Sequence, residues 1–219
     1  MPFMSTSNNF SEQWFRFIQV LLLLFVWQAA PAAGVQANQE AFDVVRSTTD
    51  ELLARISERR ETYREDRELF MTEVEDLLLP VIDFKRIARR IMAKHYKQAN
   101  TDQRERFEEV FKESLMKLYA LGLLEYSSEK VVVQEPGKSR STKKQKVSVD
   151  IYSASGEKYP ISYSMFVDAC GLWKIENVVV NGINIGLTYR NQFSRLMKEN
   201  RNDIDLVIVG WSAEVNNGE

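Results

Sequence analysis

Few residues of this chain are of the types and spacing that catalysis or metal binding requires. His95 is the only histidine and Cys170 the only cysteine among 219 residues. One imidazole and one thiol cannot complete the usual four-ligand zinc site, and a lone cysteine excludes an intrachain disulfide. The sequence therefore predicts no metal, no cofactor and a fold that is held together by its core.

The other ionisable clusters are typical of solvated helix faces. The carboxylates of residues 73–76 have no electrophile or metal partner near them in the sequence. Arg86, Arg89 and Arg90 could hold an anionic group, but their spacing is that of the solvated side of an amphipathic helix. Because the sequence also lacks a phosphate-binding glycine loop, a nucleophile elbow and a dinucleotide fingerprint, we predict no catalytic residue.

Composition limits the class of protein further. The chain has 29 Lys and Arg against 31 Asp and Glu, so its formal net charge of -2 gives no indication of nucleic-acid binding. A hydrophobic content of 44% and a charged content of 27% suit one globular domain with a core.

The N-terminus has the layout of a secretory signal peptide. Residues 17–30 (FIQVLLLLFVWQAA) are almost wholly apolar, follow Arg16 and precede Pro31 and several small residues. This run is shorter than the roughly 20 residues that span a bilayer as a helix. We predict a signal peptide over residues 1–37, cleavage after Ala37 and an exported domain over residues 38–219. A second cleavage site at Ala32 and an uncleaved anchor are the alternatives.

The exported domain should place helices against a small sheet. Apolar spacing predicts helices over about residues 38–57, from the charged stretch before Phe70 to Pro80, from Asp83 to Ile91, and over 101–124, the last being the longest. Asn38 and Asp83 are the expected N-caps of the first and third helices. Two more helices should cover about 187–200 and 203–215.

Between these helices the period changes to that of β-strands. Residues 130–135, 147–151, 161–167 and 173–179 alternate apolar with polar side chains and are separated by short turns. The loop 136–144 is basic and is expected to be a solvated turn. The predicted fold is α+β, with helices packed on a small antiparallel meander sheet that turns one face toward them.

Two stretches carry a resemblance to a known family. The first contains residues 83–88 (DFKRIA) and 96–99 (YKQA), and the second contains 173–178 (WKIENV), 181–185 (NGINI) and 189–193 (YRNQF). Together they resemble the MlaC family of periplasmic phospholipid-binding proteins, also called toluene-tolerance auxiliary proteins, over about residues 42–210. The chain lacks glycines that the family usually has within Ile91–Lys94 and directly before Asp203.

The resemblance implies a function and partners. Proteins of this family carry phospholipid between an outer-membrane MlaA-type lipoprotein complex and an inner-membrane ABC transporter complex with an MCE-domain protein of the MlaD type, and so maintain outer-membrane lipid asymmetry. It also implies a periplasmic location, no enzymatic activity and a hydrophobic cavity that buries the acyl chains.

A carrier of this kind is needed because a free phospholipid hardly crosses an aqueous gap. Exposing two acyl chains of about 16 carbons to water costs on the order of 25 kcal/mol, at roughly 0.8 kcal/mol for each methylene. We expect the cavity to lie between the inner face of the sheet and the helices. The residues predicted to contact lipid are Ile87, Ile91, Phe111, Leu115 and Tyr119 from the helices, and Val147, Val149, Ile151, Ile161, Tyr163, Met165, Trp173 and Ile175 from the sheet.

Two other functions fit the same sequence. One is a periplasmic adaptor whose core is filled and whose sheet recognises a protein instead of a lipid. The other is a small enzyme in which Asp83, His95 or Glu176 acts as an acid or base in an apolar pocket. The enzyme requires one of these three side chains to point into the cavity.

Overall fold

The computed structural model describes residues 33–124, 130–137, 141–153 and 155–216, with side chains left out of the description at 33–39, 119–122, 124 and 212–216. Residues 1–32, most of the predicted signal peptide, lie outside the described residues. No helix in the described part of the chain combines the length and the apolar character needed to cross a membrane.

The helices follow the predicted order. They are α2 (Ala33–Glu65), α3 (Arg67–Leu78), α4 (Phe84–Met92), the short 3-10 helix η1 (Ala93–Lys97), α5 (Thr101–Leu124), α6 (Ile185–Glu199) and α7 (Ile204–Asn216). The prediction of a helix over 101–124 is confirmed. The prediction that it would be the longest is wrong, because α2 continues through the charged residues 58–65 and spans 33 residues.

Side-chain caps fix where several helices begin. The Asp83 carboxylate accepts the backbone N–H of Arg86 at 2.8 Å, which confirms the predicted cap of α4. Asn184 caps α6 in the same way, through the N–H of Leu187 at 3.0 Å. The prediction of Asn38 as a cap is wrong, since α2 already includes it.

The strands form one antiparallel sheet in sequence order, which confirms the predicted meander. They are β1 (Lys130–Val133), β2 (Lys144–Tyr152), β3 (Lys158–Val167), β4 (Trp173–Val180) and the two-residue β5 (Ile183–Asn184). Strand β5 was not predicted, because two residues are too few to show an alternating apolar and polar pattern. A register shift opposite Ser164 and Met165 places a β-bulge in the β3–β4 pair.

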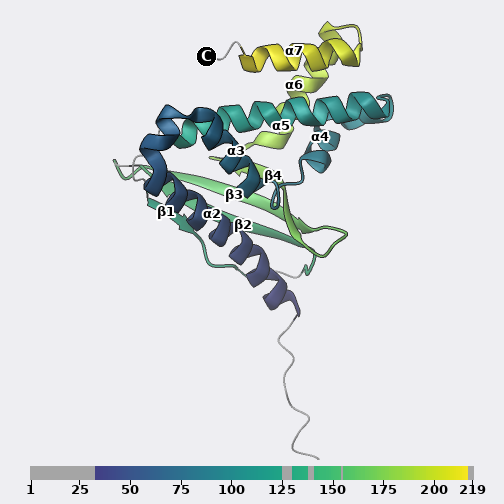
Figure 1. Cartoon of the computed structure of the whole chain (residues 1–219). Helices are drawn as coiled ribbons and strands as arrows, with labels where there is room; N and C mark the ends of the chain where they lie inside the picture. Colours follow the sequence, from purple (N-terminus) through teal and green to yellow (C-terminus); the bar gives the residue numbers. More distant parts are fainter. Residues whose placement is uncertain (1–32, 125–129, 138–140, 154, 217–219) are drawn as a thin grey trace, which may run out of the picture. The chain divides into compact units, whose positions relative to one another are not determined.

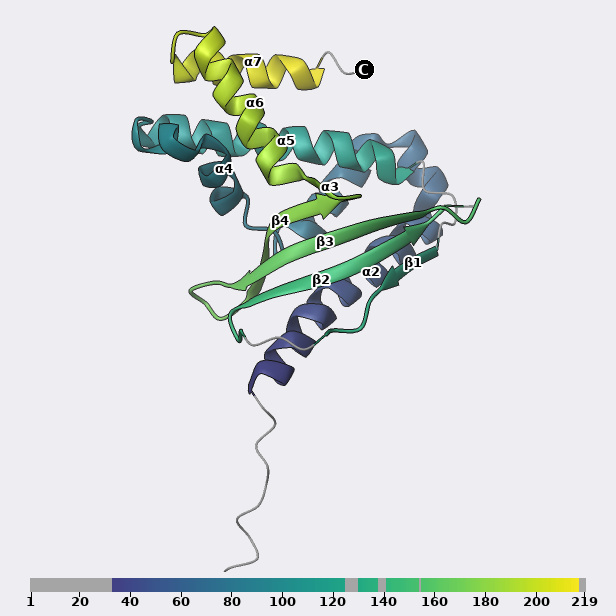
Figure 2. The ribbon, with the colours of Figure 1, turned by 180° about the vertical axis from the view of Figure 1, so that it is seen from behind.

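Two buried clusters hold the layers together. The first lies among the C-terminal half of α2 and helices α3, α4, α5, α6 and α7, where the centroid of the Phe107 ring lies 4.8 and 5.3 Å from those of Phe193 and Trp211, edge to face. The second joins α2 to the inner face of the sheet. Figure 1 shows α2 running across this face, and Figure 2 shows the opposite face of β2 and β3 from behind, where no described helix crosses these two strands.

Candidate functional site

An apolar cavity of about 360 Å³ lies between the helices and the inner face of the sheet. This volume falls within the range of roughly 300 to 1,000 Å³ that is usual for small-molecule sites. The lining residues are Val44, Val45, Thr48, Thr49 and Leu52 of α2; Val74 and Leu78 of α3; Val81, Ile82, Phe84 and Ile87 in and before α4; Phe111, Leu115, Met116 and Leu123 of α5; Ile151, Ile161, Tyr163, Ile175, Asn177, Val178 and Val180 of the sheet; and Ile185, Gly186 and Tyr189 of α6.

The period of each element explains which side chains reach this cavity. In β3, Ile161 and Tyr163 are two residues apart and therefore point to the same face of the sheet. In α2, Val45, Thr48 and Leu52 follow the spacing of three and four residues that defines one helix face. Each of these elements thus lines the cavity with the side chains of one face.

The cavity includes about half of the residues predicted to contact lipid. Those that line it are Ile87, Phe111, Leu115, Ile151, Ile161, Tyr163 and Ile175. Whether they contact lipid stays a prediction, because the structure contains no ligand. The side chain of Tyr119 lies outside the described residues.

The other predicted residues lie in packed parts of the core instead of the cavity wall. Val147, Val149, Met165 and Trp173 are on the inner face of the sheet, as predicted, but they are buried together with Ala41 and Val45 of α2. Ile91 is buried in the cluster among the helices. Alternation in a strand identifies the face but not which part of that face a helix covers directly, and contact of these residues with lipid also stays a prediction.

Sequence reasoning missed the contributions of α2 and α6. Val45, Thr48 and Leu52 were available as a helical stripe, but the site was assigned to the other helices. The sheet and α6 supply Asn177, Gly186 and Tyr189, whose role depends on a contact between distant segments. No period in the sequence signals such a contact.

Asn177 and Gly186 join the sheet to the start of α6 at the edge of the cavity. The backbone N–H of Gly186 donates to Oδ1 of Asn177 at 3.1 Å. A Cβ atom at position 186 would lie 2.3 Å from the same oxygen, so only glycine permits this approach. The contact fixes where α6 begins and thereby places Ile185 and Tyr189 in the wall.

The three acid or base candidates do not line the cavity. The Asp83 carboxylate caps α4. His95 is buried, with its Nδ1 3.3 Å from Oε1 of Gln98 and its ring 6.0 Å from that of Phe193. The buried Glu176 carboxylate pairs with Arg86 at 2.6 Å and Arg90 at 3.2 Å. Among the described residues no group of acidic, His or Cys side chains could hold a metal ion.

A polar cluster with shifted pKa values connects α2 to α3. Tyr63 Oη donates to Glu73 Oε2 at 2.7 Å, and Arg59 pairs with the other carboxylate oxygen. The hydrogen bond from Tyr63 and that from Arg59 hold the pKa of Glu73 below its usual value, while burial raises the pKa of Tyr63. α2 departs from helical geometry at Arg59, so this cluster lies at a kink.

Comparisons with known proteins agree with this architecture. The family model described as MlaC protein matches residues 46–213. The toluene tolerance protein ttg2D of Pseudomonas putida is 39% identical over 194 residues, covering 88% of this chain and 89% of the relative. The intermembrane phospholipid transport system binding protein MlaC of Haemophilus influenzae is 22% identical over 176 residues, with 80% of each chain covered.

A solved structure has the same fold. It is the phospholipid-binding protein from Ralstonia solanacearum in complex with a phospholipid, with a TM-score of 0.74 and 21% sequence identity. The match covers 81% of this chain and 98% of the solved one. At this identity the likeness establishes the fold, which confirms the predicted α+β arrangement.

Proposed function

The chain belongs to the MlaC family, and from this membership we propose that it is a periplasmic carrier of phospholipid that holds the acyl chains in the cavity. The family predicted from the sequence is thereby confirmed. The carrier role is supported by two similar proteins, one of which is a binding protein of an intermembrane phospholipid transport system and the other a phospholipid-binding protein solved in complex with a phospholipid.

The observation that carries the proposal is the chemistry of the cavity wall. Most of its lining side chains are aliphatic or aromatic, and they come from the sheet and from α2, α3, α4, α5 and α6. Such a wall offers acyl chains an environment close to that of a bilayer, so transfer between the two requires little free energy. An adaptor with a filled core does not account for this cavity.

The direction of transfer must come from other proteins. We propose the partners that the family resemblance implies, an outer-membrane MlaA-type lipoprotein complex and an inner-membrane MlaD-type transporter complex. Within this scheme the chain works by binding and release without a chemical step. Its candidate acids and bases, which do not line the cavity, are engaged in a helix cap, in contacts with Gln98 and the Phe193 ring, and in ion pairs.

Native mass spectrometry of the protein purified from the periplasm, followed by lipid analysis, tests the proposal. We expect a mass increase equal to one or more phospholipids that disappears on denaturation. Ile161→Trp should occupy part of the cavity and reduce the lipid-bound fraction. Val209→Trp adds the same ring to the exposed face of α7 and should leave that fraction unchanged.

A wild-type protein that remains at its polypeptide mass, even after incubation with phospholipid vesicles, would contradict the carrier role. Equal lipid loss in both tryptophan variants would show that the cavity is not the binding site. Circular dichroism of each variant separates loss of lipid from loss of fold, and Leu115→Phe provides a milder change in the same wall.

A further inference from the structure

Positive charge is concentrated in two segments of an otherwise balanced chain. Residues 84–100 contain six Lys and Arg and no Asp or Glu, and residues 136–149 contain five Lys and Arg and no Asp or Glu. The whole chain has a formal net charge of -2. Where the fold brings these segments together, it creates a surface of one sign.

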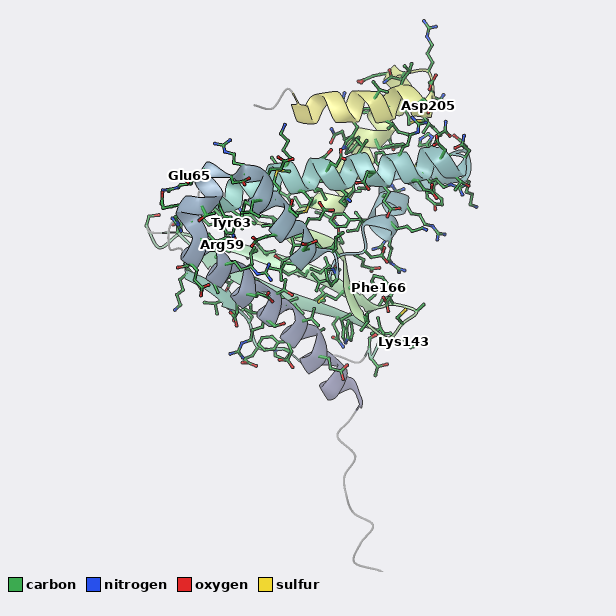
Figure 3. The ribbon with its side chains drawn as sticks, in the orientation of Figure 1. Arg59, Tyr63, Glu65, Lys143, Phe166 and Asp205 are labelled. Atoms are coloured by element: carbon green, nitrogen blue, oxygen red, sulfur yellow. The ribbon has the colours of Figure 1, made fainter. Side chains whose placement is uncertain are left out.

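The fold joins the outward side of α4 to the outer face of the sheet. The Arg86 guanidinium lies 3.9 Å from the centroid of the Phe166 ring. Phe166 is opposite Lys144 on β2 and opposite Lys174 on β4. The carbonyl of Lys143 accepts the backbone N–H of Val167 at 3.0 Å, and Figure 3 shows Lys143 beside Phe166.

We call this surface the basic face. Its cations are Lys85, Arg86, Arg89 and Arg90 of α4, and Lys143, Lys144, Lys146 and Lys174 at the sheet. At 100° per residue the four α4 cations cover the side opposite Phe84, Ala88 and Ile91, which are buried. Glu176 pairs with both Arg86 and Arg90 and offsets about one of their positive charges, so the eight cations of this face still leave an excess of positive charge.

An apolar turn projects beside the basic face. Residues 169–172 (ACGL) join β3 to β4, and all four are exposed, Leu172 to 56%. The Asp168 carboxylate accepts the N–H groups of Cys170 and Leu172, both at 2.9 Å, so the acidic group of this turn binds its backbone. The turn therefore offers small apolar side chains and Leu172 next to Lys174.

The type of cation indicates the class of partner. Arg86 and Arg90 are engaged by Glu176, and Arg89 lies over the Tyr96 ring at 5.5 Å, whereas the cations at the sheet are all lysines. Protein–protein interfaces are depleted in lysine, but an anionic bilayer attracts each nearby lysine by about 1 kcal/mol. An exposed leucine among such lysines suits insertion at the headgroup level.

We propose that the basic face and the turn 169–172 form a docking surface for an anionic phospholipid bilayer. The lysines supply long-range attraction and Leu172 enters the interfacial region. This contact is separate from the cavity, since none of these residues lines it. A carrier with this surface can rest on an anionic membrane in addition to any protein partner.

Flotation of the lipid-loaded protein with vesicles tests the docking surface. We expect binding to vesicles that contain phosphatidylglycerol and none to vesicles of phosphatidylcholine alone. Binding should weaken as the ionic strength rises from about 0.1 M to about 1 M, because the Debye length falls from about 10 Å to about 3 Å. A polarity-sensitive dye on the native Cys170 should shift to the blue with the anionic vesicles only.

Charge-matched variants show whether the surface is the one identified. Replacing Lys143, Lys144 and Lys146 by glutamine should weaken binding roughly 100-fold, at about fivefold for each lysine. Leu172→Ser should weaken it about tenfold. The control replaces Arg64, Arg67 and Lys130, three exposed cations on other elements, by glutamine and should change binding little. Figure 3 places Glu65, the neighbour of Arg64, far from Lys143.

Equal binding to both kinds of vesicle, no binding to either, or equal weakening by the control variant would overturn the inference. Absence of vesicle binding together with retention on immobilised polyglutamate would assign the basic face to an acidic protein instead. Native mass spectrometry of the same samples keeps the two proposals apart. If the protein carries lipid but does not bind vesicles, the docking surface alone is contradicted. If the protein carries no lipid, the carrier role is contradicted.

Discussion

Ala93 has a backbone conformation that its own side chain disfavours. It lies between α4 and η1 with φ 49° and ψ -116°, a region that glycine enters freely and residues with a Cβ atom enter at a cost. Asn202, directly before Asp203, also has a positive φ of 62°. The two places where the chain lacks a glycine usual in the family are therefore places where the fold requires left-handed backbone.

We expect Ala93→Gly to stabilise the protein by about 1 kcal/mol, because relief of the unfavourable φ outweighs the added flexibility of the unfolded chain. The urea midpoint from circular dichroism measures the change. Ala88→Gly, in the body of α4, should act in the opposite direction by about 1 kcal/mol or more. A lower midpoint for both variants would contradict the assigned backbone at Ala93.

The cluster of Arg59, Tyr63 and Glu73 makes stability depend on pH. Since the pKa of Glu73 is lowered in the folded protein, the unfolded chain binds more protons than the folded protein as the pH falls, and protonation favours unfolding. The stability that Glu73 contributes is complete above its ordinary pKa of about 4.5 and is lost as the pH falls through the lowered pKa. Tyr63 is only 1% exposed, and its buried hydroxyl donates its hydrogen bond to this carboxylate.

Glu73→Gln preserves the shape of the side chain and an acceptor for Tyr63 but removes the charge. We expect it to lower the free energy of unfolding by about 1 kcal/mol at neutral pH and to flatten the loss of stability below about pH 4.5. Urea titrations at neutral and acidic pH give both quantities. Parallel pH profiles for the variant and the wild type would exclude this role. Glu61→Gln, at an exposed ion pair with Arg64, is the control and should change little.

At the scale of elements, spacing predicted most helices and strands but not their limits. The helix at Thr101 has a wide apolar stripe, and its predicted bounds agree with α5. The C-terminal turns of α2 lack such a stripe and are stabilised by charged pairs such as Arg64–Glu61 and by contacts with α3. Alternation identified the inner face of the sheet, but α2 covers part of that face, which sequence spacing does not encode.

The position of α6 depends on the close approach of Gly186 to Asn177. We expect Gly186→Ala to lower the free energy of unfolding by about 1 to 3 kcal/mol, because the new methyl group displaces the Asn177 oxygen and leaves the N–H of residue 186 without it. The cost should shrink in an Asn177→Ala background, so a double-mutant cycle measured by urea denaturation isolates the contact.

Gly210 is the matched control on α7. A Cβ atom there meets no atom within 4 Å, so Gly210→Ala should stabilise the protein by about 0.5 to 1 kcal/mol through helix propensity alone. If Gly186→Ala were stabilising as well, the close approach at α6 would not exist in solution.

For the whole molecule, the cavity has an energetic consequence. The cavity is partly open, so without a ligand its apolar wall is in contact with water, at a cost of roughly 25 cal/mol for each Å² exposed. Domains of this size have a total stability of roughly 5 to 15 kcal/mol. A protein with such a cavity is expected to gain stability from a ligand that covers this wall.

Removing the bound lipid should therefore lower the melting temperature. A ligand present at about 100 times its dissociation constant stabilises the folded state by about 2.7 kcal/mol, which corresponds to roughly 5 to 10 °C in a domain of this length. Differential scanning calorimetry of the protein before and after extraction of lipid measures the shift, and added phospholipid should reverse it. In Ile161→Trp the indole occupies part of the cavity, so extraction should change the melting temperature less, whereas Val209→Trp should respond like the wild type. A melting temperature that is insensitive to extraction in the wild type would mean that lipid does not fill this cavity in the folded state.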